Sequence, residues 1–235
     1  MNEGPVLKII GKYEQGSPEW IEVRRGMFTA SEFHSLLTAR PETLERIRQT
    51  KLAELKGAVV KKPFTSIYTE WGKVHEAQGR AQVCLELEEL GVVNSSDKCI
   101  VPGLVIQENR LWVGASADGL FLEKQLGVEI KCPYKQDNHV NHFKPQPGNQ
   151  WINGIPKKYY TQVQGGMLVT GWKYWVYASF DPRLLVDGQA IPPLFIKMLR
   201  RDEEYIKPLA EKLNYIWKSM NVNSEVYRRR HRTAG

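Results

Sequence analysis

Two acidic side chains and one lysine within residues 114–133 have a spacing that suits metal-dependent chemistry. Asp118 opens a short apolar run, and Glu129 and Lys131 stand two positions apart in a second run. Strand residues two apart point to the same face, so Glu129 and Lys131 should project together while their neighbours enter the core. Residues 123–127 are predicted to form a turn that folds Asp118 back beside them. Two carboxylates and an ammonium at one sheet edge would suit a hard divalent cation and the water that it activates.

The same three residues also fit an ordinary hairpin with a solvated, charged face. Asp followed by Glu-x-Lys resembles the core of the PD-(D/E)xK nuclease superfamily, with Ala117 in place of the proline in that name. Ala117 should be tolerated, because this residue only shapes the start of the strand. The core pattern is too short to decide between a nuclease and a hairpin.

Three further segments surround this core in a defined order. They are WIEVRRGMFTASEF at 20–33, EWGKVHEAQGR at 70–80, and YYTQVQGGM at 159–167, the last followed by ASFDPR at 178–183. Together with the core, they resemble the YqaJ-type viral recombinase family, to which phage lambda exonuclease belongs. The resemblance extends from about residue 14 to residue 183 and therefore covers most of the chain.

The resemblance implies a metal site on the core strands. Asp118 and Glu129 would bind the ion through their side chains, and the carbonyl of Ile130 would complete the shell. Glu76 would join them from the preceding helix, although a glutamate on a helix is more often a plain surface carboxylate. The implied ion is Mg2+, for which Mn2+ can substitute, and the residues leave open whether one or two ions bind.

Three polar residues are candidates for assisting the chemistry. Lys131 would orient the attacking water or neutralise charge that develops on the phosphate. Gln162 matches the first glutamine of the family's Gln-Val-Gln motif and would hydrogen-bond the water or Lys131, with Tyr159 on the same helical face. Gln164 lies on a different face and is assigned to structural or DNA contacts. The alternative for both glutamines is an ordinary polar helix face.

Arg24 and Ser31 match positions that hold the 5′-terminal phosphate in exonucleases of this family, with Ser116 as a third candidate. A guanidinium can bind phosphate in a bidentate manner, and a hydroxyl at a helix N-terminus adds a donor. Residues 29–32 are predicted to begin such a helix. The alternative is a plain helix cap with a surface arginine nearby.

Composition indicates one domain spanning residues 1–235 with an excess of positive charge. The formal net charge is +7, which mildly favours a polyanionic partner. Part of this excess lies in the run RRRHR at 228–232, so residues from about 225 to 235 are expected to form a flexible, basic tail.

The cysteines and the hydropathy exclude several classes of protein. Cys84, Cys99 and Cys132 are odd in number and have no Cys-x-x-Cys spacing, which argues against structural disulfides and a zinc site. It also argues against the four-cysteine iron–sulfur cluster of some related nucleases. No apolar run approaches the roughly 18 residues of a membrane span, and no signal peptide is recognisable. These features predict a cytosolic protein, or one made by a virus inside a cell, and the family resemblance implies a phage or prophage protein in the cytoplasm of a bacterial host.

The expected fold is α/β (α+β), a central mixed β-sheet flanked by helices around a PD-(D/E)xK, restriction-endonuclease-like core. Residues 135–157 contain several prolines and asparagines and are predicted to form a mobile loop in which His139 and His142 contact solvent or DNA. Helices are predicted at 41–56, 71–90, 158–170 and 202–220, and strands at several places within 99–131 and at 174–180 and 194–199.

The resemblance implies a metal-dependent 5′→3′ exodeoxyribonuclease acting on the ends of linear double-stranded DNA. It would leave 3′ single-stranded tails for a single-strand annealing partner and would assemble as a ring-shaped homotrimer. The alternatives are a structure-specific or sequence-specific endonuclease on the same core, and a catalytically silent DNA-end-binding module. The intact Asp118, Glu129 and Lys131 favour an enzyme over the silent module.

Overall fold

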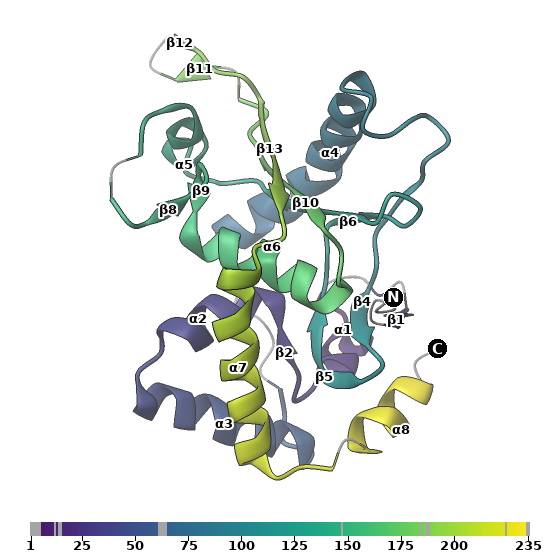
Figure 1. The fold of residues 1–235 in the computed structure, drawn as a ribbon. Coiled ribbons are helices and arrows are strands. Elements are labelled where there is room, and N and C mark those ends of the chain that lie inside the picture. Colours follow the sequence, from purple (N-terminus) through teal and green to yellow (C-terminus); the bar gives the residue numbers. More distant parts are fainter. Residues whose placement is uncertain are drawn as a thin grey trace.

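Two β-sheets form the framework, and helix α6 (Lys157–Thr170) lies between them (Figure 1). The computed structural model describes residues 6–11, 13, 16–60, 65–146, 148–183, 185–186, 189–223 and 225–233. The four-stranded sheet has the order β1-β4-β5-β2, with β1 Leu7–Ile10, β2 Phe28–Thr29, β4 Leu104–Gln107 and β5 Arg110–Ala115. The five-stranded sheet has the order β13-β10-β7-β6-β3, with β3 Cys99–Ile100, β6 Gly119–Phe121, β7 Leu126–Lys131, β10 Tyr174–Phe180 and β13 Leu194–Arg200. Two short ribbons pair β8 Trp151–Ile152 with β9 Ile155–Pro156, and β11 Leu185–Val186 with β12 Gln189–Ala190.

The five-stranded sheet is mixed, as the sequence predicted. Strand β7 is parallel to β10 and antiparallel to β6, and its register sets Glu129 opposite Tyr177. A tight turn closes the β6–β7 hairpin, and Gln125 in this turn has a φ of 50°. The hairpin returns Asp118, the residue before β6, to the side of β7, where its amide donates to the carbonyl of Val128.

Eight helices are present in the described residues, together with two 3-10 turns. They are α1 Pro18–Val23, α2 Phe33–Thr38, α3 Pro41–Leu55, α4 Ile67–Glu89, α5 Asp137–Val140, α6, α7 Glu203–Met220 and α8 Glu225–Thr233, with η1 Ala30–Glu32 and η2 Asn141–Phe143. The predicted boundaries of α3, α6, α7, β10 and β13 are correct to within a residue. Helix α4 begins at Ile67 rather than at Trp71, because Ser66 caps it by accepting from the amide of Thr69.

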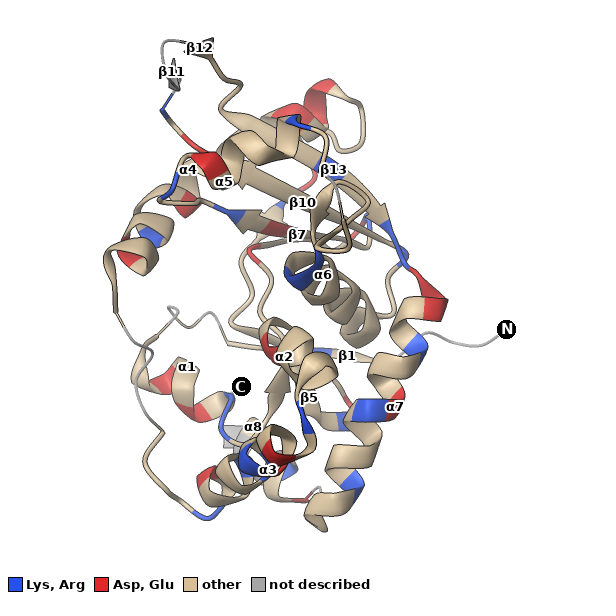
Figure 2. Cartoon of the chain, turned by 90° about the vertical axis from the view of Figure 1, so that its left-hand side faces the viewer, with Lys and Arg blue, Asp and Glu red and all other residues tan. Residues whose placement is uncertain are grey.

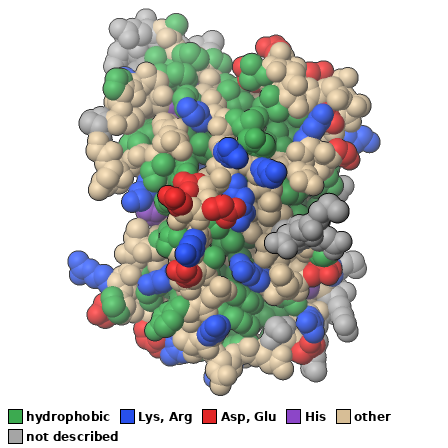
Figure 3. Space-filling model, in the orientation of Figure 1, with side chains coloured by type: hydrophobic (Ala, Val, Ile, Leu, Met, Phe, Trp, Pro, Cys, Tyr) green, Lys and Arg blue, Asp and Glu red, His purple; other side chains and the backbone are tan. Residues whose placement is uncertain are grey.

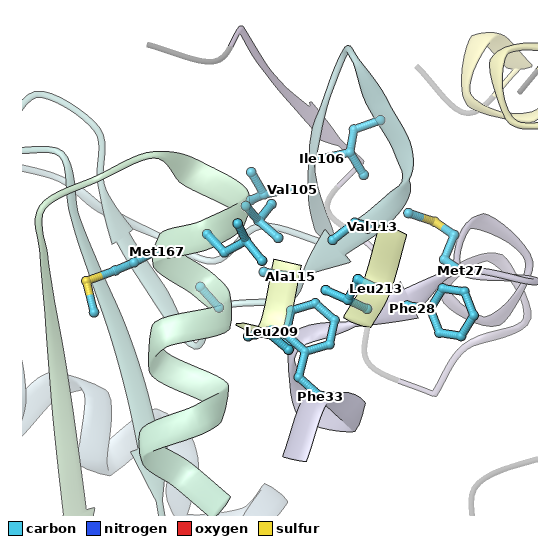
Figure 4. Packing of buried hydrophobic residues seen from close by; sticks show 14 of the residues in the cluster. Met27, Phe28, Phe33, Val105, Ile106, Val113, Ala115, Met167, Leu209 and Leu213 are labelled. Carbon is cyan, nitrogen blue, oxygen red and sulfur yellow. The ribbon is translucent and has the colours of Figure 1, made fainter. Parts of the chain in front are cut away.

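Hydrophobic packing explains the layers. Helix α4 covers one face of the five-stranded sheet, where Val83 and Leu87 pack with Val128 and Ile130 of β7. Helix α6 covers the opposite face and also contacts β4 and β5 of the other sheet. A larger cluster fills the space between that sheet, α2 and α7 (Figure 4). Glu129 and Lys131 alternate with Val128 and Ile130, as predicted from the period of two.

The C-terminal segment is ordered as helix α8, so the prediction of a flexible tail at 225–235 is wrong for its described part. Tyr227 is fully buried and His231 is 2% exposed. The Tyr227 hydroxyl donates to the carbonyl of Gly26 at 2.7 Å, and His231 Nε2 lies 3.3 Å from the carbonyl oxygen of Val23. Two side chains at helical spacing therefore anchor α8 on the turn after α1.

The segment predicted as a mobile loop, 135–157, is also partly wrong, because it contains α5, η2 and the β8–β9 ribbon. His139 is 1% exposed, and its Nδ1 lies 2.9 Å from Ser179 Oγ. The Nε2 atom of His142 lies 3.0 Å from the hydroxyl oxygen of Tyr177. Both histidines therefore attach this segment to β10, and neither is the free solvent or DNA contact that the sequence indicated.

On one face of the molecule, positive charge is interspersed with negative charge. The face seen in Figure 3 carries Lys and Arg side chains mixed with Asp, Glu and hydrophobic side chains, and it has no basic patch of one sign. Among the described residues, no helix has both the length and the apolar character needed to cross a membrane.

Candidate active site

The β6–β7 hairpin brings the three core residues together. The Oδ2 atom of Asp118 accepts from the amide of Ile130 at 2.6 Å, which ties the start of β6 to β7. Lys131 Nζ donates to Glu129 Oε1, and both side chains project from the same face of β7. Glu129 is 3% exposed. The spacing in the sequence thus predicted this cluster correctly.

Helix α4 supplies a third carboxylate and an arginine. Arg80 Nη2 donates to Glu76 Oε1 at 2.8 Å, one helical turn away. Arg80 Nε donates to the backbone carbonyl of Asp118 at 2.6 Å. Arg80 therefore fixes α4 against the start of β6 and holds Glu76 beside the hairpin. Arg80 was not among the predicted site residues, although it stands four positions after Glu76 in the same motif and so on the same helical face.

The pKa values show how closely the carboxylates interact. Burial raises the pKa of Glu129 to about 8, with further contributions from Asp118 and Glu76, while Lys131 opposes the shift. Burial also raises the pKa of Asp118, and burial followed by the charge of Asp118 raises the pKa of Glu76. For Lys131, burial would lower the pKa, but Glu129 and Asp118 outweigh it and the pKa is raised.

A hard cation fits this cluster by charge and by donor type. Carboxylates that raise one another's pKa concentrate negative charge, and all of them offer oxygen, the donor that Mg2+ prefers. In the described part of the chain, no group of three or more His, Cys, Asp or Glu side chains is positioned to hold a metal ion as it stands. Binding an ion would therefore require Glu129 and Glu76 to loosen their contacts with Lys131 and Arg80.

The cluster opens into a cavity of about 530 Å³. Glu76, Ile130 and Lys131 line it together with Trp20 of α1 and Tyr159 of α6. Lys131 Nζ lies 5.3 Å from the centre of the Tyr159 ring, within the range of a cation–π contact. This cavity gives a ligand access to the Glu76 carboxylate and to the lysine, whereas Asp118 and Glu129 are not among its described lining residues.

The two glutamines of α6 differ. Gln162 is half-buried one turn after Tyr159, and its side chain makes no hydrogen bond to any described residue. It therefore does not contact Lys131 here, and its proposed role stays a prediction. Gln164 is fully buried, donates to the carbonyl of Arg200 at 3.0 Å and accepts from the amide of Asp202 at 2.9 Å. Of its two predicted roles, structural contacts are therefore the one observed, and the DNA contact is wrong because both polar ends of its amide are engaged inside the protein.

The candidate phosphate-binding residues meet around Arg24. Arg24 Nη1 donates to Ser116 Oγ at 2.6 Å, and Nη2 donates to Thr29 Oγ1 at 3.0 Å. The guanidinium carbon lies 3.9 Å from the centre of the Trp20 ring. Burial lowers the pKa of Arg24 to about 10, and Glu32 partly opposes the shift. A partly desolvated guanidinium of this kind is a strong donor to an anion.

Ser31 lies at the edge of this cluster. Its Oγ is 3.3 Å from Thr29 Oγ1, and its side chain is exposed. The predicted helix start is only the three-residue turn η1, followed by the short α2, so the dipole argument for Ser31 is weak. Thr29, which the sequence analysis did not single out, links Arg24 to Ser31. Its amide and hydroxyl both donate to Glu32, the type of contact made in a helix capping box.

Three residues, Ser116, Ala117 and Asp118, connect β5 of the four-stranded sheet to β6 of the five-stranded sheet. Ser116 contacts Arg24, and Asp118 belongs to the carboxylate cluster. Trp20 lies beside Arg24 and also lines the cavity that contains Glu76. Arg24 and Thr29 line a neighbouring cavity, and Trp20 lines both cavities, so the arginine cluster adjoins the carboxylates.

The sequence pattern of the YqaJ-like viral recombinase domain matches residues 19–173, which include every residue of this site. The chain belongs to the YqaJ-like viral recombinase family. The family assignment made from the motifs is thus confirmed. No curated protein matches the chain significantly.

Solved structures share the fold. The alkaline exonuclease LHK-Exo from Laribacter hongkongensis is 22% identical, with a TM-score of 0.63 over 93% of this chain and 98% of that one. The same protein in complex with dAMP gives a TM-score of 0.66 at the same identity and coverage. A phage-related exonuclease from Haemophilus somnus 129PT is 14% identical, with a TM-score of 0.53 over 83% of this chain and 93% of that one. The fold class predicted from the sequence, a central mixed β-sheet flanked by helices, is confirmed, and these exonucleases share it.

Proposed function

We propose that this protein is a divalent-metal-dependent exodeoxyribonuclease that digests linear double-stranded DNA from its 5′ ends. The observation that carries the proposal is the three-residue connection between the Arg24–Ser116 contact and the Asp118 cluster. This connection places the Arg24 cluster, which is suited to bind a terminal phosphate, next to the Asp118 cluster, which is suited to hydrolysis. The structural relatives are named as exonucleases, which favours end-directed cleavage over internal cleavage.

In this proposal the carboxylates of Asp118 and Glu129 hold Mg2+, with Glu76 and the carbonyl of Ile130 as additional ligands. The ion supplies an activated water and neutralises charge on the phosphate. Lys131 cannot bind a cation and instead faces the phosphate, where its ammonium stabilises the charge that develops on the non-bridging oxygens. Once Glu129 has loosened its contact with Lys131 to bind the ion, the ring of Tyr159, 5.3 Å from Lys131 Nζ, still limits the movement of the ammonium. Gln162 is proposed to hydrogen-bond the water.

Arg24 with Ser116, Thr29 and Ser31 is proposed to bind the terminal 5′-phosphate. Arg24 already donates to two hydroxyl groups, so it is held in place before a ligand arrives. The scissile bond then lies one nucleotide inward, beside Asp118. The digestion would leave 3′ single-stranded tails for an annealing partner, and by the family resemblance the enzyme would act as a ring-shaped homotrimer in a phage-infected or lysogenic bacterium.

The test compares linear duplex DNA that carries a label at one end with covalently closed circular DNA, each with Mg2+ or with a chelator. We expect digestion of the linear DNA alone, from the 5′ end, only with metal, and faster when that end carries a phosphate. Arg24→Gln should slow digestion and remove most of the preference for phosphate. Cleavage of the circle would indicate an endonuclease, and end binding without cleavage would indicate a silent binding module. Digestion from 3′ ends would contradict the proposal.

A further inference from the structure

A second cavity adjoins the active site. It has a volume of about 380 Å³, and Lys131 and Tyr159 line both cavities, so they form a shared wall. The other walls come from α5, η2, β8, β10 and the first turn of α6. Much of this cavity is therefore built by residues 135–157, the segment that the sequence predicted to be a mobile loop.

The second cavity is positively charged. Lys157 and Lys158 line it together with Lys131, and no Asp or Glu is among its described lining residues. Neither Lys157 nor Lys158 forms a salt bridge with a described residue, and both depress the pKa of the nearby His34, after the larger effect of its burial. The end of α6 that carries these lysines faces the viewer in Figure 2. A polyanion would find uncompensated charge here.

The cavity also has a fixed aromatic wall. Trp151 packs edge-on against His142 with ring centres 5.1 Å apart, and His142 hydrogen-bonds the hydroxyl of Tyr177. Tyr159 stacks on Tyr177 at 5.8 Å. Aromatic rings held in this way offer a flat surface for a nucleobase, because every base has a π-face.

The positions of the sites define a path. Arg24 packs on Trp20, Trp20 lines the first cavity, and that cavity contains Glu76 and Lys131. A strand with its terminal phosphate at Arg24 and its scissile phosphate at Lys131 must continue beyond Lys131. The adjoining cavity lies there, and its volume falls within the usual range for ligand sites of roughly 300–1,000 Å³.

We propose that the second cavity binds the nucleotide on the 3′ side of the scissile phosphate, in the strand that the enzyme retains after each cut. Lys157 and Lys158 bind the next phosphate along that strand, and the ring of Trp151 stacks on the base. The assignment of strand and direction rests on the proposed function. The segment 135–157 is then a substrate-binding element that keeps the shortened strand in place between cuts.

The phosphate contact is tested with the double variant Lys157→Gln, Lys158→Gln and with DNA carrying one neutral methylphosphonate. We expect the variant to lower kcat/KM by about tenfold or more on normal DNA. A methylphosphonate between the second and third nucleotides should lower kcat/KM of the wild type by a similar factor and should not lower kcat/KM of the variant further. Lys173→Gln, a matched charge change on an exposed lysine beyond the other end of α6, should behave as the wild type.

The base contact is tested in the same way with Trp151→Ala and DNA that lacks the second base. Loss of stacking should lower kcat/KM by about tenfold, and the abasic substrate should abolish the difference between variant and wild type. Trp151→Phe should recover most of the rate because it keeps an aromatic face. An abasic position five nucleotides further along serves as the control and should leave the effect of Trp151→Ala unchanged.

A third measurement separates this inference from the proposed function. The affinity of metal-free protein for the same DNA is measured in chelator by fluorescence anisotropy, which requires no cleavage. If the wild type binds DNA ends but never cuts them, the proposed function fails. The cavity assignment is still supported if the lysine variant binds normal DNA more weakly than the wild type and this difference disappears on DNA with the methylphosphonate. If the variants retain both full affinity and full kcat/KM, or if the substrate changes act equally on variant and wild type, the cavity assignment is overturned.

Discussion

Glu129 is held nearly free of solvent beside Asp118, Glu76 and Lys131, and its pKa of about 8 has consequences for stability. Its ordinary value is 4.5, so the folded protein binds this proton more tightly than the unfolded chain does. The resulting stability is fully present below about pH 4.5 and is lost as the pH rises through about 8. The metal-free protein should therefore become less stable across this range.

The first prediction follows from this loss of stability with rising pH. Between pH 5 and pH 8 the metal-free wild type should lose up to about 1.4 kcal/mol of unfolding free energy per pH unit, and Glu129→Gln should show a flatter dependence. Added Mg2+ should raise the melting temperature more at pH 8 than at pH 5, because a larger share of the carboxylates has lost its protons at pH 8. Melting curves at several pH values, with Mg2+ or chelator, measure both effects. Equal slopes for wild type and Glu129→Gln would contradict the assignment of this proton.

The second prediction concerns Lys131. Lys131→Met keeps the length of the side chain but removes the charge, so cleavage should fall by about 10²–10³-fold through loss of transition-state stabilisation. Binding of DNA ends in chelator should weaken much less, because Arg24 and the lysines of α6 remain. Lys124→Met is the matched control, since Lys124 pairs with Asp97 away from the site. A loss confined to KM would assign Lys131 to substrate binding instead.

Among the secondary-structure elements, α8 has a structural role that its basic composition does not indicate. Tyr227 and His231 contact the carbonyls of Gly26 and Val23, which flank Arg24 in the chain. Helix α3 holds the same turn from another side, because Glu54 accepts from the amide of Gly26 at 2.8 Å. Helix α8 thus supports the turn that presents Arg24, and deleting it would disturb the fold and not merely remove charge.

The third prediction tests this support. Tyr227→Phe removes only the hydroxyl that contacts Gly26, so the preference for 5′-phosphorylated ends should fall several-fold while the stability loss stays at about 1 kcal/mol. Tyr160→Phe removes a hydrogen bond of similar length, to Asp202, away from Arg24 and should leave the preference unchanged. Rates on phosphorylated and unphosphorylated ends give the ratio. Equal ratios in the two variants would confine Tyr227 to a general structural role.

The predictability of each element depends on where its partners lie in the chain. Helix α3 and strand β10 carry their own signals, a first-turn proline in one case and a dense aromatic run in the other, so their limits followed from local sequence. Helix α8 and residues 135–157 have polar or proline-rich compositions. They are ordered by contacts with distant residues, such as His139 with Ser179, which no local pattern reveals.

The same distinction holds within the site. Glu129 and Lys131 were predictable because a strand's period of two fixes their common face, and Asp118 because the turn is short. Glu76 came only from the family resemblance, since nothing local distinguishes it from other helix glutamates. For Gln164 the sequence left open structural or DNA contacts, because its buried partners, the backbone of Arg200 and Asp202, lie more than thirty residues away.

In the molecule as a whole, the two sheets position different parts of the proposed site. Arg24 and Thr29 lie next to the four-stranded sheet, whereas Glu129 and Lys131 lie on the five-stranded sheet. The short link from Ser116 to Asp118 and helix α6 set the distance between these groups. Rigid packing of α6 against both sheets is therefore needed to place the scissile bond one nucleotide from the terminal phosphate.

The last prediction tests that packing through Gly165 of α6. A Cβ added there would collide with the ring of Phe33 and lie 3.2 Å from the Cβ of Ala30, so α6 could not keep its approach to η1 and α2. Gly165→Ala should destabilise the protein by about 1–3 kcal/mol, and at roughly 2–4 °C per kcal/mol the melting temperature should fall accordingly. Because α6 contacts both sheets, unfolding should remain a single transition, which calorimetry measures.

Gly72 in α4 provides the matched control, because an added Cβ there would meet only the carbonyl oxygen of Cys132, at 4.0 Å. Gly72→Ala should raise the stability by about 0.5–1 kcal/mol, the usual gain when alanine replaces glycine inside a helix. Opposite signs for the same substitution in two helices would tie the cost at Gly165 to the close approach of α6. A Gly165→Ala protein as stable as the wild type would mean that α6 can shift between the sheets. In that case the spacing of the two halves of the site would depend on the short link from Ser116 to Asp118 alone.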